Sequence, residues 1–432
     1  LADYVENLYH LQLYWMACLS RGPEAPKFNG GTFLFCNDWR SWGGYYWYQN
    51  TRELYWSLLP ANHAELFAPL LDLYWRNLPA AQKLAKDLFN APGACYQETM
   101  GRNGNGDKAN NSYTCLYHST GTEIAHQFYQ YYLHTRDEAF LREKAYPLMK
   151  EVLTYHLSFV SQEADGLYHI YPSNGRETYW WIKDSITDLT ALRATLPILI
   201  RESERLGRDA DRRAHWTDVL THLVPFPADE AKNRWLPGVF LDEFPPTPYK
   251  RPEQLYPPDK SRTLKSKGNV FNSENVDCEP MWPWGLVGLD SPATDYSRAR
   301  QTFLQRRYND WSWGIAWDPS ALMATRLGLS NEVVKCFGQY VRSVQEFPCG
   351  LPGTPGNAPK TWGGQIGDSP GLDAAGVLAT AVQEMQLQSY GGVIRVFPAW
   401  PKGWQSEFTL VAEGGFLVSS RVSTNGEIPE IR

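Results

Sequence analysis

The chain has 432 residues, of which 43% are hydrophobic and 20% charged, and this composition excludes an intrinsically disordered protein. Its formal net charge of −6 lacks the basic excess of a nucleic-acid-binding protein, and no apolar run reaches the about 18 residues of a membrane-spanning helix. We therefore expect neither nucleic-acid binding nor membrane insertion. Trp, Tyr and Phe make up 14% of the chain. Because aromatic rings pack apolar area and also offer a polar handle, this content favours carbohydrate binding, or else a large aromatic core.

Helical periodicity dominates the chain up to about residue 390. Apolar residues at helical spacing predict helices over residues 2–20, 51–59, 62–89 with a break near Pro79, 120–134, 137–160, 187–206, 209–223, a short segment around Trp284, 296–307, 319–327, 332–347 and 373–389. So many helices with such long connections predict a mainly α fold, a double-layered helical toroid rather than a simple bundle.

Long loops rich in Gly, Pro, Asn and Trp connect these helices, over residues 28–50, 93–117, 168–183, 225–275 and 348–372. Loops of such length in a compact domain are usually functional or disordered. Since several of them carry aromatic residues, we predict a site assembled by loops at one end of the helical scaffold.

The pattern changes to strand periodicity after Tyr390. Residues 391–398 and 408–412 predict short strands, and residues 415–422 alternate, with Phe416, Val418 and Ser420 on one face. We therefore predict a helical catalytic domain over residues 1–389 and a small β-domain, expected to be truncated, over residues 390–432. Since the chain starts without Met or a signal-like segment, it is expected to be a fragment or a mature piece.

The cysteines are scattered without a CxxC pair, so a zinc site is not expected. Cys95 and Cys115 flank a polar loop and are candidates for a disulfide, although the odd total of 7 argues against a complete disulfide framework. No motif for a nucleophilic serine, a bound nucleotide or a metalloprotease is present. Carboxylates in aromatic loops remain, and a pair of them, one protonated and one ionised, is the chemistry of glycosidic bond cleavage.

Glu177 is the first candidate, in the segment YPSNGRETYWW. An apolar wall of tryptophans would raise the pKa of its carboxyl group, as a general acid requires, whereas the simpler alternative is a loop glutamate paired with Arg176. Asp373 is the second candidate, where a Gly-rich loop enters a helix. Its simpler role is an N-cap, and the two roles are compatible because a helix N-terminus keeps a carboxylate ionised.

Other candidates are individually weaker. Glu98 lies in an otherwise uncharged loop and is a candidate for binding a sugar hydroxyl. Further acidic residues in suggestive places are Glu53, Asp188, Asp277, Glu279 and Asp318. Candidates for the wall of a sugar pocket, some of which we expect in the core instead, are Trp42, Trp47, Trp180, Trp181, Trp313 and Trp362.

Segments in chain order resemble the catalytic domain of family 95 glycoside hydrolases, the inverting α-L-fucosidases and their α-L-galactosidase relatives. Residues 50–56 (NTRELYW) and 64–70 are similar to that family's Asn-Thr-Gln-Met-Asn-Tyr-Trp segment and following helix, and residues 172–177 (PSNGRE) to its Pro-Ser-x-Ser-Pro-Glu loop. The later similarities are residues 310–317 (DWSWGIAW) to its Gly-Trp-Ser-x-Ala-Trp helix start, and residues 384–389 (EMQLQS) with 397–401 (FPAWP) to its ending.

The resemblance implies an (α/α)6 barrel and an inverting exo-glycosidase that needs no cofactor. It places the general acid at Glu177, the general base at Asp373 and a residue that orients water at Asn50. In such a site the two carboxyl groups stand about 6.5–9.5 Å apart, which leaves room for the water. The resemblance also implies an oligo- or polysaccharide substrate with a terminal α-L-fucoside-like or α-L-galactoside-like sugar, and a secreted, periplasmic or cell-surface location.

The sequence departs from the family at sugar-reading positions. The first asparagine of a family pair falls on Tyr48, a His-rich family segment aligns with residues 275–280, where Asp277 and Glu279 stand, and Asp373 is followed by AAGV. Two alternatives therefore stay open. One is a polysaccharide lyase on an (α/α) toroid, with His118 or His169 as base and Arg176 neutralising a uronate, and the other is a non-catalytic glycan-binding protein.

Overall fold

A computed structural model of the protein describes residues 1–29, 45–105, 116–241, 274–307, 318–343, 345, 350 and 371–432. Within these ranges the chain is mainly helical, and its strands form small antiparallel pairs. None of the described helices is long and apolar enough to cross a membrane.

The helices divide into an inner and an outer set according to how completely they are buried. The inner helices, buried along most of their residues, are α2 (Tyr48–Trp56), α5 (Ser119–Thr135), α8 (Ile186–Leu206), α12 (Ser320–Arg326) and α14 (Asp373–Gln386). The outer helices are α1 (Ala2–Leu19), α3 (Ala64–Arg76), α4 (Leu78–Phe89), α6 (Glu138–Phe140), which continues through a π-turn into α7 (Tyr146–Leu157), α9 (Arg213–His222), α11 (Ala293–Leu304) and α13 (Ser330–Ser343). This alternation of inner and outer helices is the expected (α/α)6 barrel.

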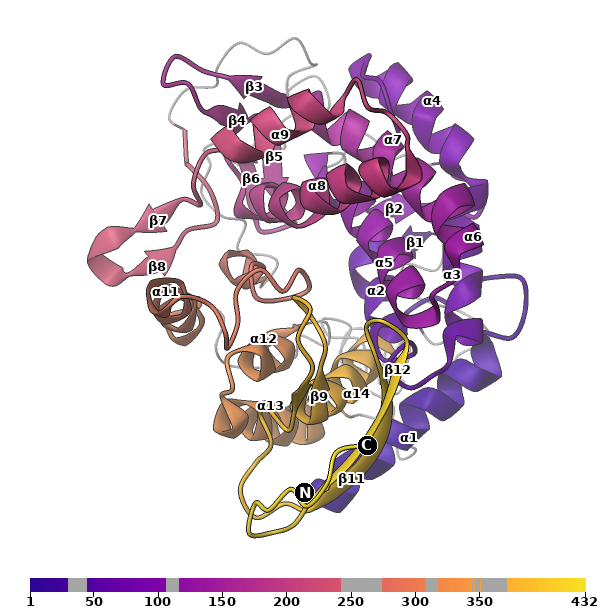
Figure 1. Cartoon of the computed structure of the whole chain (residues 1–432), viewed down its shortest axis with the longest axis vertical. Coiled ribbons are helices and arrows are strands. Elements are labelled where there is room, and N and C mark those ends of the chain that lie inside the picture. The colour runs from indigo at the N-terminus through magenta and orange to yellow at the C-terminus, as the bar shows by residue number, and fades with distance from the viewer. Residues whose placement is uncertain are drawn as a thin grey trace, which may run out of the picture.

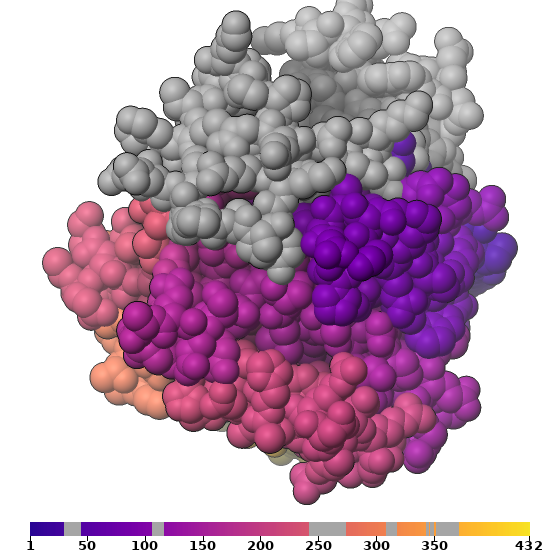
Figure 2. Space-filling view, turned by 90° about the horizontal axis from the view of Figure 1, so that it is seen from above, coloured from indigo at the N-terminus to yellow at the C-terminus, as the bar shows by residue number. Residues whose placement is uncertain are grey.

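Two apolar clusters fill the space between the two sets. One joins α2 to α8 with their outer partners, and the other joins α11 to α14. In Figure 1 the purple and magenta helices lie on one side and the orange helices on the other, and α14 packs against α2 where the two sides meet. Viewed from above, the segments coloured purple to pink form one continuous surface (Figure 2). Burial of these apolar faces supplies the main driving force for the fold.

Most helix boundaries agree with the sequence expectation to within a few residues. The break near Pro79 is confirmed, because α3 ends at Arg76 and Pro79 lies in the first turn of α4, where a missing N–H costs little. The helix expected around Trp284 is wrong: only a 3₁₀-turn, Val276–Cys278, forms there, and Pro280 and Pro283 prevent a longer helix.

Short strand pairs support the loops at the helix ends. These pairs are β1 (Tyr46–Trp47) with β2 (Thr99–Met100), β3 (Val160–Gln162) with β4 (Tyr168–Ile170), β5 (Ser173–Gly175) with β6 (Tyr179–Ile182), β7 (Ala228–Asp229) with β8 (Arg234–Trp235), and β9 (Leu387–Gln388) with β10 (Arg395–Val396).

The C-terminal appendage is a hairpin of β11 (Ser406–Ala412) and β12 (Phe416–Val422), which confirms the two strands expected there. It runs beside α1, near both chain ends (Figure 1). The N–H groups of Val411 and Gly414 donate to the carbonyls of Pro60 and Leu133, so the hairpin is attached to the helical barrel. The division at residues 389 and 390 stays a prediction.

Candidate active site

Glu177 lies in the turn of a β-hairpin. Strands β5 and β6 pair antiparallel, so residues 176–178 form the connection between them. Arg176 has a left-handed backbone with φ of 56°, which a non-glycine residue keeps only when its surroundings hold it there. The Oδ1 atom of Asn174 accepts the N–H of Trp181 at 2.9 Å, which closes the hairpin. The hairpin therefore presents Glu177 in a fixed turn.

A chain of buried ion pairs holds this turn. Arg176 is only 1% exposed, and its Nη2 and Nε atoms donate to Glu123 at 2.8 Å and to Glu279 at 2.9 Å. Arg52 donates to the same carboxylate of Glu123 at 2.6 Å. Burial acts to raise the pKa of Glu123, but the two guanidinium groups outweigh it and the pKa lies below its usual range. The predicted substrate-binding residues Arg176 and Glu279 are thus placed within this ionic chain.

Asp373 is the first residue of α14, where the helix was expected to begin, and its side chain is fully buried. The N-cap role suggested for it is wrong, because Leu372 occupies the N-cap position. Its Oδ2 atom accepts a hydrogen bond from Nδ2 of Asn50 at 3.0 Å, and its Oδ1 atom accepts one from the N–H of Ala374 at 2.9 Å. Burial raises the pKa of Asp373 to about 6, against these two hydrogen bonds. The carboxyl group can therefore exchange a proton near neutral pH.

The contact between Asn50 and Asp373 depends on a close approach of α2 and α14. One turn beyond Asp373, a Cβ atom added to Gly376 would lie 2.2 Å from the carbonyl oxygen of Glu53 and 3.0 Å from Cα of Leu54. Only glycine allows the two backbones to lie this close. Gly376 thus lets the first turn of α14 lie against the second turn of α2, one turn beyond Asn50.

A glutamate that the sequence analysis missed connects the acid turn to the same helix. Glu274 is buried, and its carboxyl group accepts hydrogen bonds from the N–H of Glu177 and the hydroxyl of Thr178, each at 3.0 Å, and one from the side chain of Gln49. Burial raises the pKa of Glu274 to about 8. Gln49 and Asn50 are consecutive residues of α2. Gln49 is linked to the backbone of Glu177 through Glu274, and Asn50 donates to the carboxylate of Asp373.

Glu98 fixes the start of α2. Its carboxylate accepts the N–H of Gln49 at 2.7 Å and its carbonyl accepts the N–H of Tyr48 at 2.8 Å, so it caps a helix whose preceding residue supplies no side-chain cap. Burial raises the pKa of Glu98. Tyr48 is fully buried and donates to Gln127 at 3.2 Å. These two candidate substrate-binding residues therefore support the position of Asn50.

The aromatic candidates separate into different environments. Trp180 is half-buried, and its indole N–H donates to the carbonyl of Glu177 at 2.8 Å. Trp181 is buried in the core, and Trp47 is half-buried against the same core cluster. Trp42, Trp313 and Trp362 lie outside the described residues, as does Cys115, so their roles and the Cys95–Cys115 pairing stay predictions. Among the tryptophan candidates that the structure describes, Trp180 is the one whose side chain bonds to Glu177.

The residues of the lyase alternative are occupied by other partners. His118 is buried between the carbonyl of Pro172 at 2.8 Å and the hydroxyl of Tyr155 at 3.1 Å, and burial lowers its pKa to about 4. The ring nitrogens of His169 lie 2.7 Å from Asp184 and 3.1 Å from Asp165. Because Arg176 is already paired with two carboxylates, a charge-neutralising role for it toward a uronate gains no support.

Asp277 is buried in the 3₁₀-turn Val276–Cys278, and burial raises its pKa to about 6, against the nearby charges of Arg234 and Arg306. Gln49, Glu123 and Glu274 are the site residues that sequence reasoning missed. Glu123 carried a usable signal, since it is a lone acidic residue in the buried first turns of α5. Glu274 follows a long loop without periodicity, and no local pattern distinguishes it. A cavity of about 20 Å³ lies among Gln49, Arg176, Glu274 and their neighbours.

Comparison with protein families decides the relationship. The model of the glycosyl hydrolase family 95 catalytic domain matches residues 4–233, which is more than half of the 432 residues. The chain belongs to this family. The match includes α2 with Asn50 and the hairpin with Glu177, whereas Asp373 lies beyond it. The comparison with curated proteins found no match.

Solved structures agree with a glycosidase-type helical toroid. A glycosidase variant in complex with glucose has a TM-score of 0.55 at 12% identity, over 89% of this chain and 98% of that one. The wild-type glycosidase gives the same values. A kojibiose phosphorylase candidate from the human microbiome has a TM-score of 0.52 at 13% identity, and the match covers 88% of this chain. The chain spans 55% of the length of the phosphorylase. At these identities the likeness establishes the fold.

Proposed function

We propose that this family 95 member is an inverting exo-glycosidase, with Glu177 as general acid and Asp373 as general base. Its substrate would be an oligo- or polysaccharide that ends in an α-L-fucoside-like or α-L-galactoside-like sugar. In this proposal Glu177 protonates the leaving oxygen, and Asp373 removes a proton from a water that attacks the opposite face of the ring. The reaction requires proton transfer and no electron transfer.

The contact between Asn50 and Asp373 is the observation that carries this proposal. A buried carboxyl group at the start of an inner helix, with a pKa raised to about 6, has the proton affinity that a general base needs near neutral pH. The amide of Asn50 donates to one carboxylate oxygen, which fixes the orientation of the group. Asn50 would therefore act as a positioning residue for the base.

The fixed hairpin turn supports Glu177 as the acid. Its backbone N–H donates to Glu274 and its carbonyl accepts the indole N–H of Trp180, so the residue is bound on both sides of its Cα. A proton donor must be held within hydrogen-bonding reach of the leaving oxygen, and a turn fixed in this way meets that requirement. The preference for an L-fucose-like sugar rests on family membership alone.

Hydrolysis of a panel of aryl α- and β-glycosides and plant oligosaccharides tests the proposal, with the released anomer followed by proton NMR. The wild-type protein should release one monosaccharide with inverted configuration. Glu177→Gln and Asp373→Asn should each lower kcat/KM by at least about 10²-fold, since general acid–base catalysis contributes about 10²–10⁴-fold. Glu177→Gln should lose least on aryl glycosides with good leaving groups, because these need little protonation.

Retention of configuration would overturn the role of Asp373 in activating water. Full activity in either variant would remove that residue from the mechanism. Saccharide binding without turnover, unchanged in Glu177→Gln, would favour the glycan-binding alternative, and an ultraviolet-absorbing unsaturated uronate would favour the lyase.

A further inference from the structure

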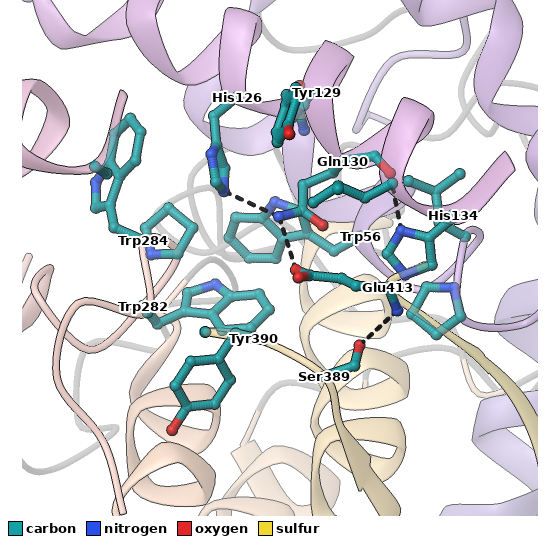
Figure 3. Close-up of a pocket in the computed structure, with 18 of the residues that line it drawn as sticks. Trp56, His126, Tyr129, Gln130, His134, Trp282, Trp284, Ser389, Tyr390 and Glu413 are labelled. Atoms are coloured by element: carbon teal, nitrogen blue, oxygen red, sulfur yellow. Dashed lines mark hydrogen bonds between the residues drawn. The ribbon is translucent and has the colours of Figure 1, made fainter. Parts of the chain in front are cut away.

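A second cavity lies at the opposite end of the barrel from Asp373. It has a volume of about 550 Å³, and its lining comes from the later turns of α5 and α8, from the C-terminal ends of α2 and α14, and from the segments after them (Figure 3). Asp373 lies at the start of α14 and Glu177 in the hairpin turn before α8, and neither residue lines this cavity. Its volume falls in the range of about 300–1,000 Å³ that small-molecule sites occupy.

Aromatic side chains form one wall of this cavity. Trp56 and Trp282 meet edge to face with ring centroids 5.2 Å apart, and Trp284 lies 5.2 Å from the ring of His126. Tyr390 completes the wall (Figure 3). Flat apolar rings of this kind, placed beside polar groups, suit the CH-rich faces of sugar rings.

Polar groups lie opposite this wall. Gln130 Nε2 donates to a carboxylate oxygen of Glu413 at 3.1 Å, and Nε2 of His126 lies 3.4 Å from the same amide nitrogen. The hydroxyl of Ser389 accepts the N–H of Glu413 at 3.0 Å, which leaves its own proton to donate (Figure 3). Burial raises the pKa of Glu413 to about 7 and lowers that of His126 to about 4. Amide, imidazole, hydroxyl and carboxyl groups thus converge on one space.

Several buried polar atoms along this lining have no hydrogen-bond partner among the described residues. They include Nε1 of Trp282, Nε2 of Gln127 and Nδ1 of His126. Trp282 and Gln127 are only 6% and 5% exposed. A buried polar group left unpaired is costly, so such a set indicates a ligand that carries several hydroxyl groups.

Two of the arginines that line the cavity are already paired with carboxylates. Arg326 forms a bidentate pair with Glu384, at 2.7 and 3.0 Å, and Arg201 pairs with Glu202 at 3.3 Å. The carboxylate of Glu123 is held by arginines at the active-site end.

Arg193, a third arginine of the lining, donates to the backbone carbonyls of Leu223 and Val224, each at 2.9 Å, and Glu413, whose pKa is raised to about 7, accepts from the uncharged amide of Gln130. A neutral ligand with hydroxyl groups suits these partners.

We propose that this cavity is a second saccharide-binding site, which takes a neutral mono- or disaccharide. The ligand stacks on the wall of Trp56, Trp282 and Trp284, and its hydroxyl groups bind Gln130 and Glu413. This site does not depend on the proposed acid and base, and it would hold a product or a portion of a glycan away from the place of cleavage.

The test measures binding to the Asp373→Asn protein, in which turnover is blocked. The probes are L-fucose, D-galactose, D-glucose, maltose and lactose, with glucuronic acid and glucosamine as charged comparisons, followed by saturation-transfer NMR and calorimetry. At least one neutral sugar should bind, and Gln130→Ala or Glu413→Ala should weaken that binding at least tenfold. Both side chains are partly exposed, so these variants should keep the folded Tm.

Matched controls come from a similar pair on the outer surface. Gln82 donates to Glu151 at 2.9 Å, and neither residue lines the cavity, so Gln82→Ala and Glu151→Ala should leave binding unchanged. With Asp373 intact, Gln130→Ala should hydrolyse a short aryl glycoside at the wild-type rate. The proposal is overturned if no neutral sugar binds, if all binding survives in both Gln130→Ala and Glu413→Ala, or if a charged sugar binds better than its neutral counterpart. These outcomes leave the acid and base proposal untouched, because hydrolysis is measured separately.

Discussion

The two candidate catalytic carboxyl groups are held in place by different interactions. The hairpin of Glu177 is fixed by charge, through the buried contacts of Arg176 with Glu123 and Glu279. The base, Asp373, is fixed by close packing at Gly376 and by a neutral amide donor. A short turn has little apolar surface of its own to bury, whereas a helix start can use the approach of its neighbour. The stability and activity that depend on the hairpin of Glu177 (the acid side) should therefore respond most to loss of charge. Those that depend on the start of α14 with Asp373 (the base side) should respond most to added side-chain volume and to pH.

Removing the charge on the acid side should have the largest effect. Arg176→Ala leaves the carboxylates of Glu123 and Glu279 buried without this partner, and breaking a buried ion pair typically costs about 3–5 kcal/mol. Urea unfolding measures this loss. The control is Arg205→Ala, which removes more exposed pairs with Glu138 and Glu202 and should cost about 1 kcal/mol or less. Equal losses of unfolding free energy in the two variants would contradict the conclusion that buried ion pairs hold the hairpin of Glu177.

Adding one methyl group on the base side should have the next largest effect. Gly376→Ala places a carbon against the backbone of Glu53, so α2 and α14 must separate, at a cost of about 1–3 kcal/mol. We also expect at least a tenfold loss of kcat/KM, because Asn50 moves away from Asp373. Gly338→Ala in α13 is the control, since its new Cβ meets only the flexible side chain of Arg342 and alanine favours the helix. A gain of stability in both variants would show that the close approach of α2 and α14 does not require glycine at position 376.

Changing pH should affect the base side through Asp373. Activity should fall as the pH drops through about 6, the folded pKa of Asp373, because protonation removes the general base. The folded pKa lies above the unfolded value of about 3.9, so the stability contributed by the protonated group is present at low pH and lost as pH rises through about 6. Asp373→Asn should accordingly have a higher Tm and a larger free energy of unfolding than wild type at pH 7, by up to roughly 3 kcal/mol for a shift of about two pKa units. At pH 4 the two proteins should have similar Tm values. An acidic limb of kcat/KM near pH 4 instead of 6 would contradict this assignment.

The smallest effect is expected where a neutral group replaces an already protonated one. Burial raises the pKa of Glu274 to about 8, so the group is mostly protonated at pH 7 and Glu274→Gln replaces it with a neutral side chain of similar shape. We expect kcat/KM within about threefold of wild type, which is roughly 0.6 kcal/mol. Glu274→Ala removes the acceptor for the N–H of Glu177 and should lose more than tenfold. If both variants lose activity equally, an ionised Glu274 is needed instead.

The sequence predicted those features that depend on local pattern. Helical periodicity located nearly all inner and outer helices, and the Gly-rich approach to a helix located Asp373 at the start of α14. Trp284 shows where local pattern fails, since apolar residues around it suggested a helix that Pro280 and Pro283 prevent.

Contacts between distant segments could not be read from the sequence. Glu98 caps α2 from 49 residues away, and the carboxyl of Glu274 reaches Gln49 across 225 residues. The interpretation of Arg176 shows the same limit. A loop arginine beside a glutamate suggests a local pair, but the side chain turns into the core and pairs with Glu123 and Glu279 instead.

The first turn of α2 restricts where residues could be inserted into the chain without disturbing the site. Successive residues of a helix point about 100° apart, which lets Gln49 face Glu274 while Asn50 faces Asp373. Inserting a single residue inside this turn would rotate both side chains away from their partners at once, although every side chain involved would still be present. Insertions in the loops that lead to Glu177 or Asp373 would leave the angle between the side chains of Gln49 and Asn50 unchanged. The first turn of α2 therefore sets the directions of both side chains, whereas the lengths of the surrounding loops do not affect these directions.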